Sequence, residues 1–302
     1  MARLISLVED ASPRLREAMA ALAPHAGRAH VVGITGSPGV GKSTTTSALV
    51  AAWRAAGRRV GVLAVDPSSP FSGGALLGDR VRMQEHALDP EVYIRSMASR
   101  GHLGGLSWTT PQAARVLDAA GCDVVLVETV GVGQSEVEVA GLADTTLVLL
   151  APGMGDGIQA AKAGILEIGD VYVVNKADRD GADLVRRDLR SMLALGERAA
   201  DDWRPPIELT VATSGRGLPE LVAAIEEHRA WLASSGRLAS RRTLRARREV
   251  EAIAVEVLRG RWGAVGEESA LDALAGEVAR GELDAYAAAD RLLGAPARSA
   301  LS

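Results

Sequence analysis

The chain has 302 residues and a formal net charge of −4, with 47% apolar and 24% charged residues. This composition is typical of a globular protein with a sizeable core, and the acidic balance argues against a general nucleic-acid-binding protein. The single cysteine, Cys122, excludes an intramolecular disulfide, and no apolar run is long enough to span a bilayer. We therefore expect a cytoplasmic protein without a secretion signal and without a nucleic-acid or membrane partner.

The first elements of the chain lead into a glycine-rich segment. Residues 10–27 have the spacing of a short amphipathic helix, and residues 30–35 form an apolar run typical of a buried strand. Residues 36–43 then fit the pattern Gly, four residues, Gly-Lys-Ser, and residues 44–56 are predicted to be helical. A strand, such a loop and a helix in this order predict a phosphate-binding loop.

The chemistry of this loop predicts a nucleoside-triphosphate site. Glycines let successive backbone N–H groups point at a phosphate chain, and the helix N-terminus adds its positive dipole end. Lys42 is expected to reach the β- and γ-phosphates, and the Ser43 hydroxyl to ligate Mg²⁺. The residues expected to bind the nucleotide here are Gly36, Pro38, Gly39, Val40, Gly41, Lys42, Ser43 and Thr44.

Beyond the loop, short apolar runs alternate with helical patterns such as 182–195 and 218–233. Several runs are almost continuous Val, Leu and Ile, as expected of parallel strands that are covered on both faces. The sequence therefore predicts an α/β fold with a doubly wound, mostly parallel sheet, right-handed crossovers and helical extensions at both ends. The runs are 60–65, 92–94, 123–127, 145–151, 171–174 and 207–211.

Acidic residues follow two of these runs, at the sheet edge where ligands gather in such folds. Asp66 follows the run 60–65, and Glu128 follows the run 123–127 shortly before Gly131, whose N–H is suited to a γ-phosphate. Asp79, in a glycine-rich stretch, offers a further carboxylate. The expected metal ligands are Ser43, Asp66, Asp79 and Glu128, and the expected catalytic set is Lys42, Asp66, Asp79 and Glu128. The residue that positions the attacking water is left open among Arg100, His102 and Gln134.

A second loop predicts which base is bound. Asn175-Lys176-Ala177-Asp178 follows an apolar run, and a carboxylate at Asp178 can accept hydrogen bonds from both N1–H and the 2-amino group of guanine. Adenine lacks both groups and would leave that carboxylate unpaired. Asn175 is expected to brace the loop and the Lys176 stem to cover the base. Thr213-Ser214-Gly215, after the last run, completes the expected guanine site through Ser214 and Gly215.

The end of the chain has a different character. Residues 237–248 contain six arginines, and the sequence from there to residue 293 is helical in pattern without a strand signal. Two interpretations of the arginines stay open, a solvated helix face and a surface for an acidic partner. Helices are expected around 267–280 and 283–293. They are too short for a core of their own, so we expect them to pack on the main domain or on a second subunit.

Several runs of residues together resemble one family. The chain is similar to the G proteins that act as chaperones of adenosylcobalamin-dependent acyl-CoA mutases, the methylmalonyl-CoA mutase-associated GTPase (MeaB/ArgK-type) family. The similarity covers about residues 10–295. The matching runs are residues 33–43, 65–71, 77–80, 95–106, 127–136 and 175–178.

This resemblance implies a GTPase that uses GTP/GDP and Mg²⁺ and meets adenosylcobalamin only through its partner mutase. It also implies a switch loop that maps to about residues 151–162, where Gln159 and Lys162 would couple nucleotide state to the mutase, and a homodimer formed by C-terminal helices. The expected division is an N-terminal helical extension at 1–29, a P-loop GTPase domain at 30–235 and a C-terminal helical dimerisation extension at 236–302.

Three other functions compete with the chaperone hypothesis. A kinase or ATPase linked to Lys/Arg/Orn transport would normally use ATP, against the guanine pattern at Asn175 and Asp178. A nickel-delivery GTPase would want a His-rich tract or a cysteine pair, and the chain has neither. A GTP switch for another partner, with negligible turnover, is compatible with the sequence.

Overall fold

The computed structural model describes residues 1–10, 12–67, 83–99, 109–129, 135–153, 167–196, 199, 201–263 and 270–294. Contacts divide the chain into two compact units, residues 1–245 and 246–302. The first unit contains the whole sheet. The division falls within one long helix, α10 (Arg237–Gly263), ten residues beyond the start of the C-terminal extension drawn from the sequence.

The first unit is built on a seven-stranded sheet in which every neighbouring pair is parallel. The strand order is β3-β2-β4-β1-β5-β6-β7, so the chain adds strands on both sides of β1. The predicted doubly wound α/β fold is confirmed, with a strand at every predicted apolar run. The strands are β1 (His30–Thr35), β2 (Val60–Pro67), β3 (Val92–Ser99), β4 (Val124–Thr129), β5 (Thr145–Leu150), β6 (Val171–Val174) and β7 (Ile207–Leu209).

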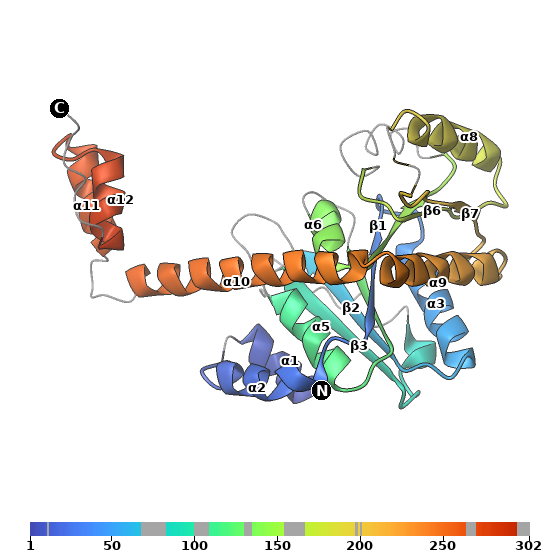
Figure 1. The fold of residues 1–302 in the computed structure, drawn as a ribbon, viewed down its shortest axis with the longest axis horizontal. Helices are drawn as coiled ribbons and strands as arrows, with labels where there is room; N and C mark the ends of the chain where they lie inside the picture. Colours follow the sequence, from blue (N-terminus) through green and yellow to red (C-terminus); the bar gives the residue numbers. More distant parts are fainter. Residues whose placement is uncertain are drawn as a thin grey trace. The chain divides into compact units, whose positions relative to one another are not determined.

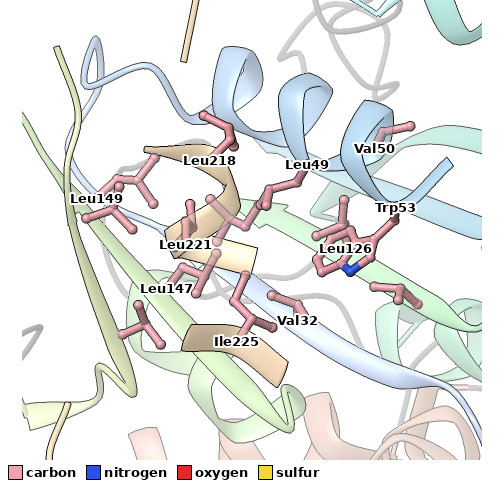
Figure 2. Close-up of a cluster of buried hydrophobic side chains, with 14 of the residues drawn as sticks. Val32, Leu49, Val50, Trp53, Leu126, Leu147, Leu149, Leu218, Leu221 and Ile225 are labelled. Atoms are coloured by element: carbon pink, nitrogen blue, oxygen red, sulfur yellow. The ribbon is translucent and has the colours of Figure 1, made fainter. Parts of the chain in front are cut away.

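Helices cover both faces of the sheet (Figure 1). On one face, α3 (Lys42–Ala55) and α9 (Leu218–Ser234) pack on the central strands. Figure 2 shows this cluster, where Leu49 and Trp53 of α3 and Leu221 and Ile225 of α9 meet strand residues such as Leu126. On the other face lie α5 (Thr109–Ala119), α6 (Ser135–Leu142) and α8 (Ala182–Leu193). Burial on both faces explains why β1, β4 and β5 carry no exposed residue.

The N-terminal segment differs from its prediction. One helix is predicted over residues 10–27, whereas the structure contains α1 (Ala2–Glu9), α2 (Leu15–Leu22) and the 3-10 turn η1 (Ala23–His25). Pro13 accounts for the break, because a proline disfavours helical backbone at the residue before it. Ile5 and Val8 of α1 are fully buried in the same cluster as the sheet residue Val31. The first helices are therefore part of the core of the first unit.

The arginine-rich segment is bound to the amino edge of the sheet. Arg241 donates to both carboxylate oxygens of Asp170, at 2.9 and 2.8 Å, just before β6. Arg242 and Arg245 both reach Asp144, just before β5, with the Arg242 contact at 2.9 Å. Asp144 is 1% exposed. For these three arginines neither open interpretation holds, because their acidic partners lie within the same chain.

Two buried histidines adjoin this edge. Nε2 of His30 and Nδ1 of His228 each lie 2.8 Å from the Thr145 hydroxyl, which can donate to one ring and accept from the other. Burial lowers the pKa of His30 to about 4, against a raising effect of Asp144. Burial likewise lowers the pKa of His228 to about 4, against a raising effect of Asp170. Both imidazoles are therefore neutral in the folded protein at pH 7.

We expect the first unit to lose stability between pH 6.5 and pH 4. In this window the unfolded chain binds protons at both histidines while the folded chain does not, so the free energy of unfolding falls as the pH falls. From pH 7 to pH 5 the loss is about 2 kcal/mol for each histidine. Urea unfolding at pH 7.5 and pH 5.0 measures it. His30→Gln should remove about half of the pH dependence, and an unchanged pH dependence in this variant would contradict the assignment.

The second unit contains the end of α10 together with α11 (Ala270–Ala279) and α12 (Ala285–Leu293). Asp284 caps α12 by accepting the backbone N–H of Tyr286 and Ala287. Among the described residues from 246 onward, Ala288 is the only hydrophobic side chain that is buried. Within the described ranges, no helix combines the length and apolarity needed to cross a membrane.

Candidate nucleotide-binding site

The phosphate loop connects the carboxyl end of β1 to the first residue of α3. Gly36 follows β1 with φ +139°, and a Cβ at this position would lie 2.3 Å from the Leu149 carbonyl oxygen. A side chain is therefore excluded by both conformation and space. Gly41 precedes α3 with φ +97°, so the loop enters the helix through a left-handed residue. The predicted strand–loop–helix arrangement is present.

The Lys42 side chain folds back over this loop. Its Nζ donates to the carbonyls of Gly36 at 2.7 Å and Ser37 at 3.2 Å, and the residue is 7% exposed. These two carbonyls thus hold the ammonium group against the backbone of the phosphate loop. This places a fixed positive charge beside the backbone N–H groups of a helix N-terminus, an arrangement suited to a phosphate chain.

Two hydroxyls of α3 bind the carboxylate at the end of β4. Ser43 Oγ donates to Glu128 Oε1 at 2.6 Å, and Thr46 Oγ1 lies 2.7 Å from Glu128 Oε2. Glu128 is 4% exposed. The serine hydroxyl and the carboxylate form an all-oxygen donor set, which fits Mg²⁺ and its preference for hard ligands.

The remaining predicted metal and switch residues are only partly covered. Asp66 lies near the carboxyl end of β2, two residues beyond Ala64, which is paired with Glu128, so its backbone lies at the edge that carries the phosphate loop. The other candidates lie outside the described residues. These are Asp79, Arg100, His102, Gly131, Gln134, Gln159 and Lys162.

Asn175 joins three loops at this edge. Its Nδ2 donates to the Val40 carbonyl of the phosphate loop at 2.8 Å, and its Oδ1 accepts from the Thr210 hydroxyl and the Ala212 N–H at 3.2 and 3.1 Å. Asn175 is 3% exposed. A Cβ on Gly41 would lie 2.4 Å from its Nδ2, so glycine is required there for close approach as well. The sequence predicted a bracing role without indicating these partners.

Lys176 and the loop after β7 complete the arrangement. Lys176 has φ +57°, and its Nζ donates to the Gly39 carbonyl at 2.6 Å. Asp178 follows on an exposed turn. The Ala177 N–H donates to the Thr210 carbonyl, and Ser214 and Gly215 lie in the turn closed by the bridge between Val211 and Arg216. The phosphate loop, the Asn175 loop and the Ser214 loop thus lie side by side.

Sequence reasoning missed Thr46, Thr210 and Ala212. Thr46 lies one helical turn after Lys42. The only sequence signal for its position was this spacing, which places the two residues on one face of the helix. Thr210 and Ala212 contact Asn175 at sequence separations of 35 and 37. No local sequence pattern predicts these contacts.

The parallel α/β sheet, the Gly-Lys-Ser loop before α3 and the Asn-Lys-Ala-Asp loop after β6 define a P-loop protein of the GTPase type. The family model described as "Methylmalonyl Co-A mutase-associated GTPase MeaB" matches residues 1–266. The chain therefore belongs to this family.

Relatives and solved structures agree with this assignment. A protein of Pyrococcus abyssi is 47% identical over 294 residues, which cover 97% of this chain and 91% of that protein. The mouse "Methylmalonic aciduria type A homolog, mitochondrial" is 42% identical over 70% of this chain and 52% of its own length. The crystal structure of a "LAO/AO transport system kinase" aligns with a TM-score of 0.72 and 29% identity, covering 97% of this chain and 91% of that one.

Proposed function

We propose that the chain is a Mg²⁺-dependent GTPase that gates the loading of adenosylcobalamin into an acyl-CoA mutase. The observation that carries the nucleotide part is the three-loop junction at Asn175, which ties the phosphate loop to the segment bearing Asp178. A nucleotide whose base is bound by Asp178 would then place its phosphate chain at Lys42. The family description carries the mutase part.

Each site residue has a proposed role. Lys42 binds the β- and γ-phosphates together with the loop N–H groups from Gly36 to Thr44, and Gly131 offers a further N–H. Ser43 and Glu128, with Asp66 and Asp79, hold Mg²⁺, whose charge offsets that of the phosphates. Asp178 reads guanine, and Lys176, Ser214 and Gly215 enclose the base.

The proposed partner is a methylmalonyl-CoA mutase or a related adenosylcobalamin-dependent mutase. Residues 151–162 would couple nucleotide state to this partner through Gln159 and Lys162. A homodimer through the C-terminal helices is supported by their exposed apolar side chains. Among these, Val250 is 67%, Leu271 50% and Tyr286 87% exposed.

Hydrolysis measurements test the proposed partnership. GTP turnover by the purified protein is measured alone and with each adenosylcobalamin-dependent mutase of its host, with an unrelated CoA-binding protein as control. Marked acceleration by one mutase is expected. If no mutase changes the rate while GTP still binds tightly, the chain is instead a GTP switch for another partner.

A kinase function remains the alternative, because a structurally similar protein carries the name of a transport-system kinase. The carboxylate of Asp178 argues against a kinase that uses ATP. Guanine offers this carboxylate two donors, N1–H and the 2-amino group, and adenine has neither. We therefore expect no phosphoryl transfer from ATP to a protein acceptor.

Asp178→Asn should change the base preference from guanine to xanthine. A carboxamide presents one acceptor and one donor, which match N1–H and the 2-oxo group of xanthine but clash with the 2-amino group of guanine. We expect GDP affinity to fall about 100-fold, the size of a lost charge-assisted hydrogen bond, and XDP affinity to rise. Fluorescent-nucleotide titration measures both. Asp183→Asn, on an exposed position of α8, is the matched control. Parental GDP affinity in Asp178→Asn would contradict the role.

A further inference from the structure

Thr46 occupies an unusual position in the first turns of α3. It is fully buried, and its hydroxyl oxygen lies 2.7 Å from Glu128 Oε2 and 3.0 Å from the Lys42 carbonyl oxygen. Ser43 holds the other carboxylate oxygen, Oε1, at 2.6 Å. One helix therefore contacts the two oxygens of one buried carboxylate with two different hydroxyls.

The single proton of Thr46 has two acceptors within reach. A threonine inside a helix commonly donates to the carbonyl one turn earlier, here that of Lys42. Glu128 Oε2 is closer, at 2.7 Å against 3.0 Å for the Lys42 carbonyl oxygen. The proposed function requires Glu128 to be ionised, and a hydrogen bond to an ionised oxygen is about twice as strong as a neutral one. The proton therefore belongs to Glu128.

We propose that Thr46 is a positioning residue that fixes the rotation of the Glu128 carboxylate, so that Oε1 faces Ser43. This inference rests on the proposed function, in which Ser43 and Glu128 serve Mg²⁺. Thr46 lies outside the Gly-Lys-Ser pattern, and it holds Oε2 while leaving Oε1 on the side of the metal ligands. Partners of this kind typically change metal affinity by 10- to 100-fold when they are removed.

Three variants distinguish the effect of the Thr46 hydroxyl from the effect of its packing. Thr46→Val keeps the shape and removes the hydroxyl, whereas Thr46→Ser keeps the hydroxyl. Thr45→Val is the matched control, because Thr45 is also fully buried and its hydroxyl has no hydrogen-bond partner among the described residues. The readout is the affinity for fluorescent mant-GDP as a function of Mg²⁺ concentration, which needs no turnover. The unfolding midpoint of each variant is measured beside it.

In Thr46→Val we expect the Mg²⁺ concentration at the midpoint of the affinity change to rise about 10-fold, with GDP affinity in EDTA unchanged. Thr46→Ser and Thr45→Val should stay within about twofold of the parent. A parental Mg²⁺ midpoint in Thr46→Val, or an equal shift in Thr46→Ser, would overturn the inference. If Thr46→Val fails to fold, Thr46→Ala compared with Thr46→Ser decides by the same criteria. If the GDP affinity of the unsubstituted protein does not depend on Mg²⁺, the proposed metal role is wrong, and this inference is wrong with it.

Discussion

Replacing Lys42 with alanine should lower GTP hydrolysis by about 10³-fold or more, the loss expected when a fixed positive charge is removed from the phosphates in the transition state. Lys42 is 7% exposed and its ammonium group is held by the carbonyls of Gly36 and Ser37, so water in an alanine variant replaces the lost charge poorly. Single-turnover hydrolysis with excess enzyme measures the chemical step. Mant-GTP titration separates this loss from a loss of binding.

The fold should survive this change. Lys42 is not a member of the hydrophobic clusters formed by the described residues, and alanine is a strong helix former at the start of α3. Arg58→Ala is the matched control, because it removes one positive charge just before β2, at the opposite edge of the sheet, where its side chain is 47% exposed. Hydrolysis by Lys42→Ala at the parental rate would contradict the proposed role of the phosphate loop.

Asp144→Asn should lower the free energy of unfolding of the first unit by about 3 kcal/mol. Asp144 is 1% exposed and accepts from the Val31 N–H, Arg242 and Arg245. The amide keeps the volume but removes the charge. Its NH2 group also faces other donors, so at least one donor that is paired with Asp144 loses its acceptor. Urea unfolding at pH 7.5, followed by circular dichroism, measures the change.

Glu226→Gln provides the comparison within the first unit. Its carboxylate lies 3.9 Å from the Arg229 guanidinium, and both side chains are about one third exposed, so the expected change stays within about 0.5 kcal/mol. An equally small change in Asp144→Asn would mean that the arginines of α10 contribute little to the first unit. A large change supports the view that this segment is held by its buried acids.

The fold was predictable because its determinants are local. Each β-strand contains a short apolar run, and in β4 and β5, which are covered on both faces, polar residues stand only at one end of the strand. The helix α1 was missed because its start lacks a side-chain cap and its apolar residues become informative only against the sheet. The acidic partners of the arginines cannot be predicted from local sequence, because Arg242 and Asp144 lie 98 residues apart in the chain.

Within the candidate site, only the contiguous motifs were predictable from the sequence. Gly36 to Ser43 and Asn175 to Asp178 are contiguous motifs whose residue types follow from phosphate and guanine chemistry. The contacts that tie them together are not contiguous. Asn175 meets Val40 across 135 residues, and Thr46 meets Glu128 across 82. Such pairs depend on the strand order, which places β4, β1, β5 and β6 next to one another.

The proposed function requires a guanine-specific nucleotide site in this chain. The most direct measurement is competition of GDP and ADP for bound mant-GDP on the purified protein in excess Mg²⁺. We predict that GDP displaces the probe at a concentration about 10³-fold or more below that required for ADP, because only guanine supplies the two donors that Asp178 needs. Equal displacement by the two nucleotides, or a preference for ADP, would contradict the proposed function.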